Sequence, residues 1–206
     1  SCLKESIEIN REYGSRLGLA EGLRELGLTY REKGEKEKAL KLLGESLNMF
    51  QRLRATNDVA QVDHAIVELE TIYMSIVRSM GAAVETKDPY TLGHSERVAS
   101  FAYDLGKELK LSPDELKALL TAAYLHDLGK IAISDSILQK PAKLTKEEYE
   151  VVKRHPLNGV KALESIEFPW EVKPLILHHH ERWDGSGYPD GLKGEEIPLG
   201  ARIIMV

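Results

Sequence analysis

Apolar residues near the start of the chain recur at spacings of three and four, the period of an amphipathic helix. Leu19, Leu23, Leu26 and Tyr30 follow this pattern and predict one helix. Gly34 then favours a helix end. A second predicted helix has an apolar face made of Ala39, Leu40, Leu43, Leu47 and Phe50.

Residues 1–58 also show an internal similarity at a fixed offset. The residues Leu3, Glu5, Ser6 and Ile7 correspond in this way to Leu43, Glu45, Ser46 and Leu47. Self-similarity between helix pairs is typical of tetratricopeptide (TPR) arrays, so we interpret residues 1–58 as TPR-like helical repeats that bind a protein or peptide partner. Two ordinary packed helices would show the same apolar pattern, and this alternative stays open.

A long connector helix is predicted over residues 59–87, because apolar residues continue at helical spacing without a proline. The apolar positions are Val62, Ile66, Leu69, Ile72, Ile76, Met80 and Val84. His64 stands alone in this segment and is interpreted as a core histidine. The Asp88-Pro89 pair ends the helix, since the residue before a proline avoids the α conformation. The helix either transmits a signal or only connects its neighbours.

Helix signals continue through residues 88–206. Ser112 offers a capping hydroxyl before Pro113, and acidic residues follow in the first turn. Thr145 precedes a second such acidic turn. No segment shows the alternation of a strand, so the predicted fold class is all-α.

Composition and charge limit the classes of function. The chain has 206 residues, 42% hydrophobic and 30% charged, with a formal net charge of −5. This charge argues against binding to duplex nucleic acid, although a small anionic ligand stays open. No stretch approaches the ~18 apolar residues of a membrane span. The lone Cys2 cannot form an internal disulfide, so we expect a cytoplasmic setting.

Histidines cluster in the second half of the chain, where six of the seven lie between His94 and His180. His126 is followed directly by Asp127. Imidazole nitrogens and a carboxylate suit divalent iron, manganese, nickel or zinc, and one carboxylate can bridge two ions. No cysteine accompanies the cluster, which disfavours a structural zinc site.

The segments YLHDLGKIAISDSILQKPAKLT, RHP and HHERWDGSGYPDGLKGEEIPLGARI resemble the HD-GYP subfamily of HD-domain phosphohydrolases over about residues 86–206. The HD pair alone is common, whereas HHExxDGxGYP at this distance is distinctive. Members are all-helical domains with two or three metal ions that hydrolyse cyclic di-GMP to pGpG or GMP. The resemblance implies an HD-type helical bundle over residues 88–206 and a cyclic di-GMP phosphodiesterase regulated through the repeats.

The resemblance also implies a metal-ligand set and two divalent ions, iron or manganese first and nickel or zinc second. The implied ligands are His94, His126, Asp127, His155, His179 and His180. Asp127 resembles the bridging carboxylate of the family. By this alignment His178 is an additional residue, interpreted as a histidine on the helix surface.

Further residues match the substrate side of the family motif. Lys130 resembles the lysine that faces the scissile phosphate, where it would donate a proton or neutralise charge. The signature loop at the substrate consists of Gly187, Tyr188 and Pro189. The loop could instead serve folding, with Tyr188 and Pro189 packed inward. Arg182 would bind phosphate, but an ion pair with Glu181 or Asp184 is equally compatible with its position.

The sequence departs from the family pattern in two places. Tyr90 stands where members with a third metal ion carry an acidic residue, which favours two ions, although Glu85 or Asp88 could change that count. The family also continues beyond the position of Val206 with one more aspartate ligand and basic residues. We therefore expect an HD-GYP domain that is incomplete at its C-terminus, folds, and hydrolyses cyclic di-GMP poorly.

Three other functions stay open at this stage. The HD pair permits a hydrolase that acts on another nucleotide. A non-catalytic receptor for cyclic di-GMP would keep the same loop, and the repeats could make the protein chiefly a scaffold. The oligomeric state is also open, with a homodimer as one candidate.

Overall fold

The computed structural model describes residues 2–87 and 92–206, and within these ranges it contains helices and turns and no strand. The all-α prediction is thereby confirmed. The chain forms two compact units, residues 1–75 and 76–206. Asp88, Pro89 and Tyr90, on which two predictions rest, lie outside the described residues. No helix in the described ranges is both long and apolar enough to cross a membrane.

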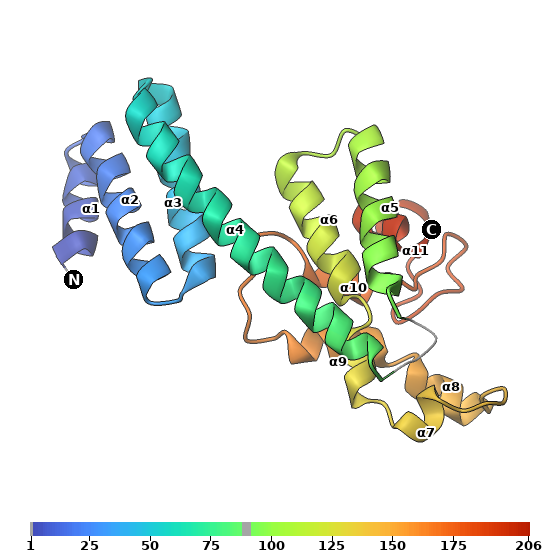
Figure 1. Ribbon diagram of the computed structural model, residues 1–206. Coiled ribbons are helices and arrows are strands. Elements are labelled where there is room, and N and C mark those ends of the chain that lie inside the picture. Colours follow the sequence, from blue (N-terminus) through green and yellow to red (C-terminus); the bar gives the residue numbers. More distant parts are fainter. Residues whose placement is uncertain (1, 88–91) are drawn as a thin grey trace. The chain divides into compact units, whose positions relative to one another are not determined.

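The first unit is a row of antiparallel helices (Figure 1): α1 (Cys2–Glu12), α2 (Arg16–Glu32), α3 (Lys36–Leu53) and the first part of α4 (Thr56–Glu85). The predicted stop between α2 and α3 is confirmed, because Gly34 has a φ of +78°. A Cβ on Gly27 would meet the side chain of Leu43, so α2 and α3 approach closely. The main core consists of Ala20, Ala39, Leu40, Leu43, Phe50, Val62, Ala65 and Leu69. Whether these helices are TPR repeats stays a prediction.

Helix α4 begins at Thr56 and ends at Glu85, close to the predicted range of 59–87. Its buried residues include Val62, Ala65, Leu69, Tyr73, Val77 and Val84. Ile72 and Ile76 were predicted on this face but are 41% and 45% exposed. From Leu69 the buried positions continue in steps of four, to Tyr73 and Val77, so Ile72 and Ile76 lie beside the buried stripe. The core prediction for His64 is also wrong, since its side chain is exposed.

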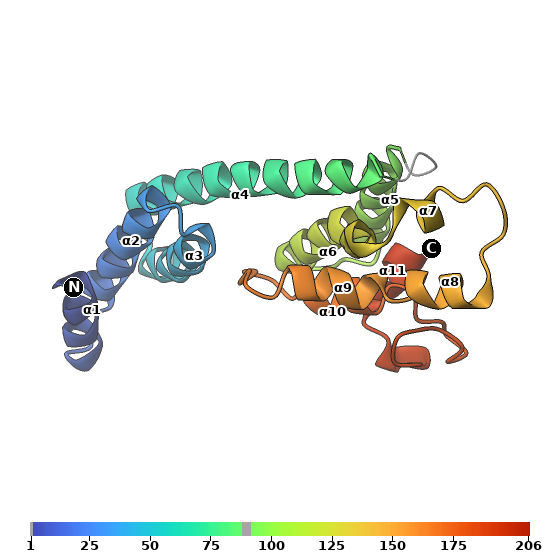
Figure 2. The same cartoon turned by 90° about the horizontal axis from the view of Figure 1, so that it is seen from below.

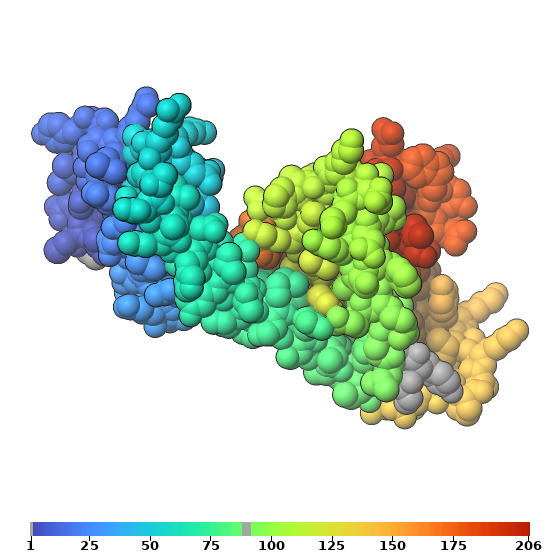
Figure 3. All heavy atoms as spheres, turned by 45° about the horizontal axis from the view of Figure 1, so that its top comes forward, coloured from blue at the N-terminus to red at the C-terminus, as the bar shows by residue number. Residues whose placement is uncertain are grey.

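The second unit contains the end of α4 and a set of shorter helices. These are α5 (His94–Glu108), α6 (Pro113–Leu125), η2 (Leu128–Ala132), α7 (Asp135–Leu138), α8 (Lys146–Val152), α9 (His155–Ala162), α10 (Lys173–Leu177), η3 (Gly194–Glu196) and α11 (Leu199–Met205). Helices α5 and α6 lie side by side (Figure 3), and α9 and α10 form a neighbouring layer (Figure 2). Both predicted helix starts are confirmed, because Ser112 and Thr145 each form a capping box.

Two glycines allow η2 to pack directly on α9. A Cβ on Gly129 would overlap the carbonyl oxygen of His155 and the amide nitrogen of Gly159. Only a residue without a side chain permits such a close approach of two backbones. The contact places the turn that follows Asp127 against the N-terminus of α9, where His155 lies.

Candidate metal centre

The six residues that the sequence predicts as ligands lie at helix ends. His94 begins α5, His126 and Asp127 follow α6, His155 begins α9, and His179 and His180 follow α10. They form two groups, each with its ligand atoms within 4.8 Å of one another. The first group is His94, His126 and Asp127, and the second group is His155, His179 and His180. The structure brings all six residues together.

Three of the histidines share one orientation. The Nδ1 atoms of His126, His155 and His179 lie 2.7, 2.8 and 2.7 Å from the carbonyl oxygens of Ala123, Val152 and Ile176. A carbonyl oxygen can only accept, so each Nδ1 carries the proton. The Nε2 atom of the neutral ring is then unprotonated and available as a metal ligand.

Burial favours the neutral form of several of the candidate ligands. It lowers the pKa of His155, and it lowers the pKa of His179 well below the ordinary value. It also lowers the pKa of His180 to about 4. For His94, burial likewise lowers the pKa. Metal binding needs the neutral imidazole, so the environment favours the form that binds an ion.

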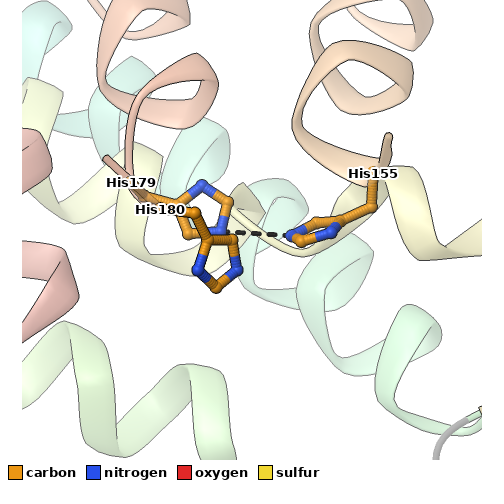
Figure 4. A group of neighbouring side chains, drawn as sticks. All are labelled: His155, His179 and His180. Atoms are coloured by element: carbon orange, nitrogen blue, oxygen red, sulfur yellow. Dashed lines mark hydrogen bonds between the residues drawn. The ribbon is translucent and has the colours of Figure 1, made fainter. Parts of the chain in front are cut away.

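The second group shows how well the donors fit a cation. Nε2 of His155 lies 3.2 Å from Nε2 of His179 (Figure 4). In their neutral forms both nitrogens present lone pairs, so the two atoms repel each other unless a cation or a proton lies between them. Two nitrogens bound at about 2.1 Å to one ion lie about 3.0–3.4 Å apart at ordinary coordination angles. The observed separation therefore fits a shared ion.

Asp127 joins the two groups. Its Oδ1 lies 3.3 Å from Nε2 of His155, and its Oδ2 lies 3.4 Å from Nε2 of His126. Burial raises the pKa of this carboxyl, but the neighbouring charge and hydrogen bond of Lys130 help to hold it well below its usual range. The group is therefore an ionised carboxylate with one oxygen directed at each cluster of imidazoles.

Lys130 lies at the same carboxylate. Its Nζ donates to Oδ2 of Asp127 over 2.8 Å, and its side chain is 16% exposed. The one-turn spacing in η2 brings both side chains to the same side. The ammonium group therefore adds positive charge at the edge of the first ligand group.

The loop of the GYP signature packs on the ligand segment. The ring of Tyr188 stacks on the ring of His180, with centroids 4.8 Å apart and an interplanar angle of 25°. The amide of Tyr188 also donates to the carbonyl of His180 over 3.3 Å. A Cβ on Gly187 would overlap the backbone of Glu181 and Arg182. Tyr188 is therefore held against the ligand segment and is only partly exposed. Whether it serves folding or substrate binding stays a prediction.

Glu181 is a contributor that the sequence reasoning did not assign. It is only 3% exposed, and its Oε1 accepts from the amides of Asp190 and Gly191 over 2.7 and 3.0 Å. The carboxylate thus ties the end of the loop to the residue that follows His180. The only sequence signal was its place in the motif, because loop closure between residues so far apart has no spacing rule.

The two remaining residues of this region are His178 and Arg182. His178 uses both ring nitrogens: Nδ1 lies 2.9 Å from the carbonyl of Pro174 and Nε2 lies 3.0 Å from Oδ2 of Asp190. It is therefore engaged outside the two ligand groups. Arg182 is largely exposed, and its Nε lies 3.9 Å from Oδ1 of Asp184. This is a long ion pair, so the side chain can still reach an anion.

A comparison with protein families identifies the class. The family model HD_5, described as an HD domain, matches residues 78–206, more than half of the chain. The chain therefore belongs to the HD domain family, and the His126-Asp127 pair lies within the matched region.

Individual relatives extend this finding. Over 163 residues the chain is 43% identical to the cyclic di-GMP phosphodiesterase response regulator RpfG of Xanthomonas campestris pv. campestris, covering 78% of this chain and 41% of that protein. It is 39% identical to a cyclic di-GMP phosphodiesterase of Thermotoga maritima, covering 68% of this chain and 38% of that protein. It is also 39% identical to the 3′3′-cGAMP-specific phosphodiesterase 3 of Vibrio cholerae, covering 68% and 31%. The chain thus spans less than half the length of these relatives.

Proposed function

We propose that the protein is a metal-dependent phosphodiesterase of the HD-GYP type that hydrolyses cyclic di-GMP to pGpG or GMP. The observation that carries the proposal is the position of Asp127, whose two oxygens lie 3.3 and 3.4 Å from histidines of different groups. A carboxylate in this position suits a bridge between two divalent ions. Two-metal sites of this kind serve phosphodiester hydrolysis by clamping the attacking and leaving oxygens.

The two groups would each bind one ion, with Asp127 shared between them. Imidazole-rich donors with one carboxylate suit iron or manganese, and nickel or zinc as second choices. When bound, the ions would polarise a phosphate oxygen and lower the pKa of a water molecule.

The protein residues would orient the reaction. The Nδ1 hydrogen bonds of His126, His155 and His179 prevent ring rotation and so fix the donor positions. Lys130 would neutralise charge that develops on the phosphate or protonate the leaving 3′-oxygen. No nucleophilic side chain is required for this route.

The loop at the second group would face the substrate. Gly187, Tyr188 and Pro189 follow the ligand segment closely, and the stacking of Tyr188 on His180 supports a role for this aromatic residue beside the substrate. Arg182, with 58% of its side chain exposed, would contact phosphate. We further propose that residues 1–58 regulate the reaction by binding a protein or peptide.

A second cyclic dinucleotide is the alternative substrate. Relatives named as 3′3′-cGAMP-specific phosphodiesterases share 36–40% identity with this chain. The two substrates differ in one base, and the ligand groups act on phosphate, so the geometry of the centre suits both.

The test is a turnover assay with the protein loaded separately with Mn²⁺ and with Fe²⁺. Cyclic di-GMP and 3′3′-cGAMP are supplied in parallel, and the products are separated by chromatography. We expect a linear dinucleotide or mononucleotide from cyclic di-GMP at the higher rate. A higher rate with 3′3′-cGAMP would reassign the substrate. Binding of two ions without turnover of either dinucleotide would contradict the proposed enzymatic function and favour a non-catalytic receptor.

A further inference from the structure

The last turn of α4 contacts the segment that begins with His94. Glu85 is 7% exposed, and its Oε2 and Oε1 accept from the amides of Gly93 and Ser95, each over 2.6 Å. These amides flank His94. The hydrogen bonds outweigh the effect of burial and lower the pKa of Glu85. Through these two hydrogen bonds the carboxylate acts as a clamp on the start of α5.

Lys87 makes a second connection from the same turn. Its Nζ donates to the carbonyls of Ile131 and Ile133 over 3.1 and 3.2 Å, and lies 3.2 Å from Oδ1 of Asp135. Its own carbonyl accepts from Nε2 of Gln139 over 3.1 Å. The segment so bound directly follows Lys130. Lys87 therefore fixes the far end of the η2 turn that positions Asp127 and Lys130.

A third contact lies one turn earlier in α4. A Cβ on Gly81 would meet the carbonyl oxygen of Tyr124 at 2.5 Å, so α4 approaches the end of α6 without an intervening side chain. Tyr124 comes just before Leu125 and His126. The end of α4 thus contacts the segments that carry or adjoin the first ligand group, namely the start of α5, the end of α6 and the end of η2.

We propose that Glu85 and Lys87 are positioning residues of the metal centre. Glu85 sets the affinity of the first ligand group for its ion by fixing His94, and Lys87 sets the turnover by fixing the Lys130 segment. This inference rests on the proposed function, since it presupposes two bound ions. The second ligand group comes from α9 and α10 and makes neither contact, so the two groups respond differently to substitution at Glu85.

The experiment is a Mn²⁺ titration of Glu85→Ala and Glu85→Gln, in which electron paramagnetic resonance measures the concentration of free Mn²⁺. Loss of a partner outside the ligand shell costs about 10–100-fold in metal affinity. We expect Glu85→Ala to lower the affinity for one of the two ions by such a factor and to leave the affinity for the other ion unchanged. Glu85→Gln retains one acceptor oxygen, so its metal affinity should lie between that of Glu85→Ala and that of the parent protein. Excess Mn²⁺ should restore turnover in both variants, which a general loss of folding would not allow.

Lys87→Met should bind both ions normally but lower kcat by about tenfold, because a small misplacement of a reacting group is costly. The matched control is Glu96→Gln. Glu96 pairs with Arg78 over 2.8 Å between the same two helices, but both side chains are 56% exposed. It should change neither metal binding nor turnover.

Three results would overturn the proposal. One is a folded Glu85→Gln or Glu85→Ala protein with two ions at parent affinity. Another is an equal loss of affinity in Glu96→Gln. The third is unchanged turnover in Lys87→Met. Failure of the parent protein to bind two ions would instead contradict the proposed function, so the two failures are distinguishable.

Discussion

The two compact units differ in what they bury. Among the described residues, the first unit buries apolar side chains and one polar one, Ser46, whose hydroxyl donates to the carbonyl of Ala20 over 2.8 Å. The second unit buries a whole set of polar side chains: Glu85, Ser95, Thr121, His126, Asp127, His155, His179 and Glu181. Buried polar groups cost free energy unless they are paired. The first interior therefore serves packing, and the second retains costly groups at the place where we propose the chemistry.

The pairing of these polar groups is uneven, and this unevenness is informative. Glu85 is paired through both oxygens, and the Nδ1 atoms of His126, His155 and His179 are paired with carbonyls. The Nε2 atoms instead face one another and Asp127. The second unit thus pairs the Nδ1 atoms of these histidines with backbone carbonyls and leaves their Nε2 atoms to bind a cation.

The largest expected effect comes from Asp127→Ala. The change removes the only carboxylate of the two ligand groups and, with it, the proposed bridge. We expect turnover to fall by about 10³-fold or more, since metal assistance is worth several kcal/mol in the transition state. Bound metal, measured by elemental analysis, should fall as well. Parent-level turnover in a folded Asp127→Ala protein would contradict the mechanism.

Removal of the metal ions should destabilise the second unit and have little effect on the stability of the first unit. A ligand at 1,000 times its Kd stabilises the folded state by about 4 kcal/mol. A chelator should therefore lower the free energy of unfolding of residues 76–206 by that order, with little effect on residues 1–75. Hydrogen exchange of the amides reports both units in one sample. Equal loss of protection in both units would contradict the expected difference in stability between them.

A core truncation in the first unit should show the opposite behaviour. Leu43 is fully buried, so Leu43→Ala should lower the free energy of unfolding by about 2–5 kcal/mol through a cavity. Metal stoichiometry should not change. Val67→Ala is the control, since Val67 is 55% exposed and should cost less than about 0.5 kcal/mol. Denaturant unfolding gives both values, and metal loss in Leu43→Ala would show that the first unit supports the centre.

The sequence predicted features that depend on local chemistry. The helix starts at Ser112 and Thr145, the stop at Gly34 and the all-α class follow from neighbouring residues, and all are confirmed. The family motif brought together the six candidate ligands, although their roles stay a prediction. Tertiary contacts were missed: Tyr73 and Val77 are buried in place of Ile72 and Ile76, because packing partners decide which helix face is covered.

The clamps were missed for a related reason. Glu85 contacts Gly93 and Ser95 across a change of helix, and Glu181 contacts the amides of a loop. Neither arrangement has a fixed spacing in sequence. The Nδ1 hydrogen bonds depend on ring rotation, which residue identity does not encode.

The smallest effect is expected at His178, and this variant tests whether the ligand assignment is shifted by one residue. His178→Ala removes a ring that lies between the carbonyl of Pro174 and Oδ2 of Asp190, a carboxylate that is 55% exposed. Such a pair contributes at most about 1 kcal/mol, so stability should fall slightly and both ions should remain. The matched variant is His179→Ala, which removes a buried ring with its Nε2 directed at His155. It should lose the ion of the second group. Elemental analysis compares the metal content of the two variants directly. Metal loss in His178→Ala with retention in His180→Ala would show that the paired ligands are His178 and His179.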